Sequence, residues 1–173
     1  FHLVVYSDST ELGGAEVVLG RLLGALPAQI RVSVVGVDHE VVDWLRQHRA
    51  GTDGTVVTAI TGRGDLAGMW RHRQVFARLH PDVLQFNLST GSSCQWAMVA
   101  ASTLPDVRRV ALEHSSMGVW SATSARLKRL TERRLDAHVA VGERTARLIE
   151  QSAGLPQGSI RTIHHGVDPV PAV

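Results

Sequence analysis

Apolar and polar positions follow two different periods along this chain. Short runs rich in valine, isoleucine and leucine are apolar on both faces, which is typical of strands in a parallel sheet that helices cover on both sides. Between these runs, apolar residues recur every three or four positions, the spacing of amphipathic helices. The runs predict seven strands: Phe1–Ser7, Arg31–Val37, Thr55–Ile60, Asp82–Asn87, Arg108–Glu113, Ala137–Val141 and Ser159–His164.

Helical stripes fill the intervals between these strands. The clearest stripe follows the first strand and consists of Ala15, Val18, Leu19, Leu22, Leu23 and Leu26. Alternating strands and helices predict right-handed βαβ units. The predicted fold class is therefore α/β: a doubly wound, mostly parallel, Rossmann-like sheet of about seven strands with helices on both faces.

The length of 173 residues suits one domain with a sizeable core. We expect that domain to cover residues 1–165. Residues 166–173, with two prolines, break the pattern and are expected to begin a linker. The chain begins at Phe1 rather than Met, already within a strand-like run, which indicates a trimmed start or a fragment.

Composition narrows the classes of function. The formal net charge is +2, and seventeen of the eighteen basic residues are arginine, a bias that favours a GC-rich bacterial gene. Acidic residues nearly balance the basic ones and only 5% of residues are aromatic, so nucleic acid is not an expected partner. Cys94 is the only cysteine, which excludes an internal disulfide, argues against thiolate metal sites and favours a cytoplasmic location.

In a doubly wound sheet, ligands bind in the loops at the carboxyl ends of the strands. The loop after the first strand contains Gly13 and Gly14 directly before a helix. Glycine allows a ligand to approach the backbone closely, and the free N–H groups of a helix start favour an anion. A phosphate site and a plain strand-to-helix turn both fit this loop.

A second glycine loop resembles a dinucleotide fingerprint only superficially. Gly62–Ala67 matches G-x-G-x-x-A, with Asp82 about twenty residues further on. However, the motif follows the third strand rather than the first, and Asp82 begins a strand instead of ending one. NAD is therefore not an expected cofactor.

Polar residues also follow the fourth and fifth predicted strands. The hydroxyl-rich stretch after Asn87 suits either a sugar or, more commonly, the cap of the following helix. Glu113 and His114 end the fifth strand and are followed by Ser115 and Ser116. A histidine here has either a catalytic or sugar-binding role or, taken alone, a structural one. No serine lies in a G-x-S-x-G elbow, so a hydrolase triad is unsupported.

Five basic residues crowd one helical stretch between 125 and 135: Arg126, Lys128, Arg129, Arg133 and Arg134. Such a helix either lies on an anionic membrane surface or, more commonly, presents a solvated face. His164 ends the predicted last strand and His165 follows it. Adjacent side chains along a strand point to opposite faces, so no metal site is expected at these two histidines.

Four stretches, in their order along the chain, resemble the N-terminal domain of GT-B fold glycosyltransferases, in particular glycosyltransferase family 4. They are LGGAEVVLGRLL from Leu12, LEHSS from Leu112, VAVGERTARLI from Val139 and IHHGVD from Ile163. His165 stands where the family usually has asparagine, and Gly142 stands where it often has serine.

The resemblance implies transfer of a sugar from a nucleotide-sugar donor with retention of configuration, without a metal or other cofactor. It implies that Gly13 and Gly14 lie near the donor diphosphate and that His114 approaches the donor sugar as the catalytic residue. Candidate substrate-binding residues are Asn87, Glu113, Ser115 and Ser116. The acceptor, held mostly by this domain, stays open between a small molecule, a lipid and a glycan.

In this family a C-terminal domain grips the donor with two glutamates that have seven residues between them. No glutamates of this chain have that spacing, since Glu143 and Glu150 have six residues between them. We therefore expect the C-terminal domain to be absent and the chain alone to be inactive. Two alternatives are another GT-B enzyme, such as a nucleotide-sugar 2-epimerase, and a non-catalytic doubly wound ligand-binding domain.

Overall fold

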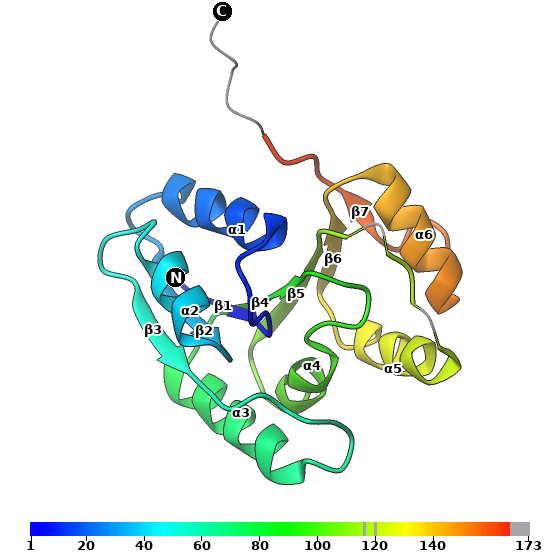
Figure 1. Cartoon of the computed structure of the whole chain (residues 1–173), viewed down its shortest axis with the longest axis horizontal. Helices are drawn as coiled ribbons and strands as arrows, with labels where there is room; N and C mark the ends of the chain where they lie inside the picture. The colour runs from blue at the N-terminus through cyan, green and yellow to red at the C-terminus, as the bar shows by residue number, and fades with distance from the viewer. Residues whose placement is uncertain (116, 120, 167–173) are drawn as a thin grey trace, which may run out of the picture.

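The strands pair side by side in one sheet, in the order β3-β2-β1-β4-β5-β6-β7 (Figure 1). All the pairings between them are parallel. The structure is a computed structural model and describes residues 1–115, 117–119 and 121–166. The strands found there are β1 (His2–Ser7), β2 (Arg31–Gly36), β3 (Asp53–Val56), β4 (Val83–Leu88), β5 (Arg108–Glu113), β6 (Ala137–Ala140) and β7 (Arg161–Thr162).

Helices alternate with the strands along the chain. They are α1 (Gly14–Ala25), α2 (His39–Arg46), α3 (Leu66–Leu79), α4 (Gln95–Ala101), α5 (Ala122–Glu132) and α6 (Glu143–Ala153). Local sequence fixes several of their starts. The Asp38 carboxylate accepts from two backbone N–H groups at the start of α2, and Ser121 accepts from Ser124 N–H at the start of α5.

Two apolar layers sandwich the sheet. On one face, Leu19 and Leu23 of α1 and Leu45 of α2 pack against β1 and β2. On the other face, Phe76 of α3 and Met98 of α4 pack against β1, β4 and β5. Figure 1 shows α1 and α2 together on one side of the sheet and α3, α4 and α5 on the other. The predicted fold class, with about seven strands and helices on both faces, is confirmed.

Two strand predictions were wrong in extent. The third strand was expected at Thr55–Ile60, but β3 covers Asp53–Val56. Among the described residues β3 pairs with β2 alone, and that pairing ends at Gly36, so the apolar residues after Val57 have no described strand to pair with. The last strand was expected to continue to His164, but β7 pairs with β6 only through Arg161 and Thr162.

The expected linker at residues 166–173 lies outside the described residues except for Gly166. Among the described helices, none is long and apolar enough to cross a bilayer.

Candidate functional site

The N-terminus of α1 lies directly after the carboxyl end of β1. Gly13 is the N-cap and Gly14 the first helical residue, and both are exposed. The Gly13 N–H donates to Oε2 of Glu16 at 3.2 Å, so this donor is already satisfied. The N–H groups of Gly14 and Ala15 have no intrahelical partner, as is general for the first turn of a helix. They are the donors that this loop can offer to an anion.

The fold itself does not require glycine at these two positions. Neither residue has a positive φ, and Gly13 adopts φ −128° and ψ −173°. A Cβ built on Gly14 would meet no atom within 4 Å, and one built on Gly13 would come no closer than 3.4 Å to Glu16. Because these two residues carry no side chain, the backbone at the helix start is left accessible to a ligand from outside.

A buried polar network lies beneath this helix start. The Glu16 side chain is 1% exposed, and its Oε1 accepts from Ser7 Oγ at 3.1 Å and from Asn87 Nδ2 at 3.3 Å. With Gly13 N–H on Oε2, the carboxylate receives three donors. The sequence indicates one of these hydrogen bonds, the one from Gly13 N–H to Glu16. A glutamate three residues after an N-cap is the second half of a capping box.

His114, the residue after β5, continues the network toward the surface. Its Nε2 lies 2.7 Å from Oδ1 of Asn87. Burial is the main cause that lowers the pKa of His114 to about 4; the Glu113 carboxylate opposes this shift and His165 adds to it. At neutral pH the imidazole is therefore uncharged.

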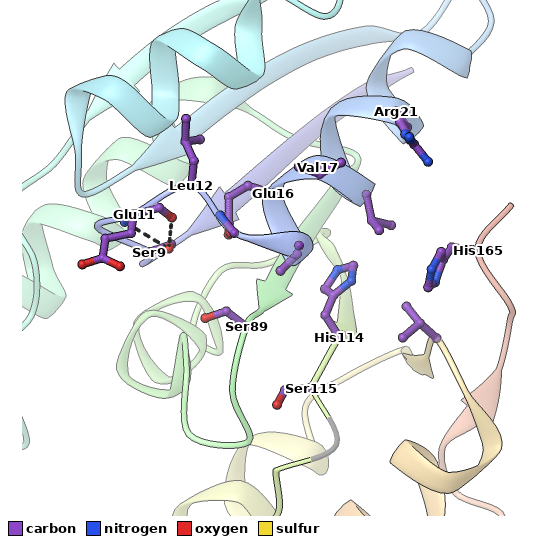
Figure 2. A pocket seen from close by; sticks show the side chains of 15 residues that line it. Ser9, Glu11, Leu12, Glu16, Val17, Arg21, Ser89, His114, Ser115 and His165 are labelled. Atoms are coloured by element: carbon purple, nitrogen blue, oxygen red, sulfur yellow. Dashed lines mark hydrogen bonds between the residues drawn. The ribbon is translucent and has the colours of Figure 1, made fainter. Parts of the chain in front are cut away.

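These groups surround one pocket at the carboxyl edge of the sheet. The cavity measures about 770 Å³. Figure 2 shows His114 below α1, with His165 on the far side of the opening and Ser115 further down. The pocket is lined by Ser9, Glu11, Leu12, Gly13, Gly14, Ala15, Glu16, Val17, Val18, Arg21, Ser89, His114, Ser115, Val141 and His165.

The structure brings four of the predicted site residues into this pocket: Gly13, Gly14, His114 and Ser115. Asn87 is fully buried and lies behind His114, to which it is hydrogen-bonded. Ser116 lies outside the described residues.

Glu113 does not lie in the pocket, contrary to its expected role as a substrate-binding residue. Its side chain is fully buried, and its Oε1 pairs with Nζ of Lys128 and lies 3.3 Å from Nε2 of His138. The reason is the alternation of side chains along a strand, which turns Glu113 toward α5 while His114 turns toward the pocket. Burial alone would raise the pKa of Glu113, but Lys128 and His138 outweigh it and hold this pKa below its usual value.

The same ion pair takes one of the five basic residues of the 125–135 stretch away from the surface. Lys128 is completely buried, whereas the apolar Leu130 of the same helix is 54% exposed. The buried stripe of α5 is Ala125, Lys128 and Thr131. Because Lys128 faces Glu113, only the arginines of this stretch remain for any outer surface.

Sequence reasoning did not single out several polar pocket residues, among them Glu16, Arg21, Ser89 and His165. Arg21 is an exposed position of α1 outside the predicted apolar stripe, and His165 was expected directly after the last strand. These residues come together only in the tertiary structure. The rejected loop Gly62–Ala67 has a local explanation, because Asp65 caps α3 through Gly68 N–H at 2.8 Å.

A Rossmann-like parallel sheet, with a helix start and a neutral imidazole meeting at its carboxyl edge, defines a domain of the doubly wound class, in which ligands generally bind at that edge. Within that class the chain belongs to Glycosyltransferase Family 4, whose model matches residues 12–170. The resemblance seen in the sequence is thereby confirmed. No curated protein matches the chain.

Solved structures agree on the fold. Anabaena Alr3699/HepE in complex with UDP is 20% identical, with a TM-score of 0.74 over 97% of this chain and 45% of that chain. A glycosyltransferase from Rickettsia africae is 12% identical, with a TM-score of 0.68 over 97% and 44% of the two chains. UDP-GlcNAc 2-epimerase from Methanocaldococcus jannaschii is also 12% identical, with a TM-score of 0.63 over 95% and 46%.

At these identities the likeness shows the fold alone, which is of the GT-B type. The chain spans less than half the length of each of these three proteins.

Proposed function

We propose that this chain is the N-terminal, acceptor-side domain of a retaining glycosyltransferase that uses a nucleotide-sugar donor. The observation that carries the proposal is the single pocket lined by both the bare helix start at Gly13 and Gly14 and the neutral His114. Family membership and the UDP and UDP-glucose complexes of Anabaena HepE support it.

In this proposal the donor diphosphate approaches the N-terminus of α1. The N–H groups of Gly14 and Ala15, together with the positive end of the helix dipole, stabilise the charge that develops on the leaving diphosphate. Arg21, about two turns further along α1, adds a positive side chain to the same pocket. No metal is needed for this stabilisation, and none is proposed.

His114 contacts the donor sugar as a neutral group. A pKa of about 4 leaves almost no imidazolium at pH 7, so His114 is poorly suited to donate a proton to the leaving group. A hydrogen bond that orients the sugar fits its state better. Ser115 and Ser89 supply hydroxyl groups nearby in the pocket.

A second domain completes the enzyme in this proposal. It holds most of the nucleotide, and its closure over this domain excludes water that would otherwise hydrolyse the donor. The acceptor is a small molecule, a lipid or a glycan. We propose a cytoplasmic location, with Arg126, Arg133 and Arg134, all exposed, available for contact with an anionic membrane surface.

The test uses residues 1–173 joined to the sequence that follows them in the gene. UDP-glucose and GDP-mannose are supplied with panels of sugar, glycan and lipid acceptors, and nucleotide release and the product's anomeric configuration are measured. We expect acceptor-dependent release and a product that keeps the donor's configuration. An inverted product, or no release with any pair, contradicts the proposal.

The alternative is a nucleotide-sugar 2-epimerase, because epimerase structures share this fold. An epimerase converts the nucleotide sugar at C2 without any acceptor. Formation of the C2 epimer in the acceptor-free reaction would therefore favour the alternative.

A further inference from the structure

Three side chains, one from α1, one from β4 and one from the residue after β5, form a continuous hydrogen-bonded row beneath the pocket. Glu16, at the start of α1, is linked to Asn87 of β4, and Asn87 is linked to His114 after β5. Glu16 and Asn87 are buried, at 1% and 0% exposure, whereas His114 reaches the pocket. The row therefore leads from a buried carboxylate to a ligand-facing ring.

Donor and acceptor roles are fixed along this row. A carboxylate only accepts hydrogen bonds, so the Asn87 amide must turn its Nδ2 toward Glu16. Its Oδ1 then faces His114 at 2.7 Å and can only accept. The ring nitrogen Nε2 must accordingly carry the proton. The opposite orientation of Asn87 would place Oδ1 against the Glu16 carboxylate, an unfavourable contact between two acceptors.

The other ring nitrogen of His114 then has a free lone pair. With Nε2 protonated in a neutral imidazole, Nδ1 is an acceptor. Within the described part of the chain no hydrogen bond involves this Nδ1. The ring belongs to the pocket lining, between α1 and His165 in Figure 2.

We propose that Glu16 is a positioning residue that, through Asn87, holds His114 in the Nε2–H tautomer and so presents the Nδ1 lone pair to a hydroxyl group of the donor sugar. The tautomer stands on the geometry of this chain, whereas the sugar contact rests on the function proposed above.

The proposal also states which sugars the site accepts. A lone pair needs a donor, so the sugar must carry a free hydroxyl group where it meets His114. Fluorine can accept but not donate, so a deoxyfluoro sugar at that carbon should be used as poorly as the deoxy sugar. A protonated Nδ1 would instead tolerate fluorine better than hydrogen.

The direct test is the tautomer itself, read from the ¹⁵N shifts of the His114 ring nitrogens at pH 7. Histidine-labelled chain is compared with Glu16→Gln, an isosteric change that lets the Asn87 amide turn over. We expect the Nε2–H form in the wild type and a mixture with the Nδ1–H form in Glu16→Gln. The matched control, Glu40→Gln in the exposed first turn of α2, should leave the tautomer unchanged.

An Nδ1–H tautomer in the wild type overturns the proposal, as does an unchanged tautomer in a folded Glu16→Gln chain. Asn87→Leu, which removes the link altogether, provides the second variant and should also lose the wild-type signature. The deoxyfluoro series is measured separately with the enzyme that contains the second domain. If the enzyme shows no preference for the hydroxyl group over fluorine or hydrogen while the tautomer behaves as expected, the proposed contact with the sugar is wrong and the positioning role of Glu16 stands.

Discussion

At the scale of single residues, the site depends on which donor and acceptor atoms are already used in hydrogen bonds or ion pairs within the chain. The sequence places Gly13, Gly14, His114 and Ser115 at strand ends, and all four line the pocket. It cannot tell that Gly13 N–H is used by Glu16, or that Glu113 faces Lys128 instead of the ligand. Both facts depend on side-chain direction and on partners far along the chain, which no local pattern encodes.

The protonation of His114 gives a prediction at this scale. We expect its imidazole to titrate near pH 4, since burial opposes the charged form, whereas an unfolded histidine titrates near 6.5. Between these two values the unfolded chain binds more protons, so this group lowers the stability of the folded chain as pH falls from about 6.5 toward 4. A ¹H–¹⁵N titration of the His114 ring checks the pKa, and a value of 6 or above would refute it.

At the scale of elements, hydrophobic periodicity located the helices and strands but not every boundary or face. β3 ends early because the neighbouring strand β2 ends, so tertiary pairing outweighs the local apolar pattern there. α5 buries a lysine because β5 supplies a carboxylate opposite it. An expectation that charged residues are exposed fails where two elements bury a complementary pair.

The buried Lys128–Glu113 pair predicts that removing the lysine alone lowers stability strongly and that a second substitution at Glu113 restores most of it. Lys128→Met leaves a buried carboxylate without its cation and should lower the free energy of unfolding by about 3–5 kcal/mol. Adding Glu113→Leu removes the unpaired charge, so the double variant should recover most of that loss. Urea unfolding of the two single variants and the double variant measures this coupling.

Arg126→Met provides the matched control, because Arg126 is exposed on the same helix. It should change the free energy of unfolding by no more than about 0.5 kcal/mol. If Lys128→Met were equally mild, the buried pair would not stabilise the packing of α5 against β5.

At the scale of the whole molecule, the parallel sheet gathers the ends of β1, β4, β5 and β6 at one edge, and the pocket lies there. The alternation of elements predicted this arrangement from the sequence alone. Donor and acceptor identity could not be predicted, because the pocket of this domain contacts only part of a nucleotide sugar in the proposed enzyme.

The proposed division of labour predicts that residues 1–173 by themselves do not transfer sugar. Without the second domain the nucleotide is held only at the α1 helix start, and water is not excluded from the pocket. Incubation of the purified chain with UDP-glucose and the acceptor panel should release no UDP above the buffer rate. Measurable transfer by the chain alone would show that the second domain is dispensable.

The most direct measurement of the central claim is nucleotide release by the enzyme that contains both domains, with valine placed at Gly14. A Cβ there meets nothing within the chain, so Gly14→Val should fold normally and fill the space where the diphosphate approaches. Gly64→Val is the matched control, because a Cβ there also meets no atom within 4 Å and Gly64 is not in the pocket. We predict that Gly14→Val lowers kcat/KM on the order of 100-fold with an unchanged Tm, while Gly64→Val retains wild-type turnover. Wild-type turnover in Gly14→Val would contradict a donor diphosphate at the start of α1.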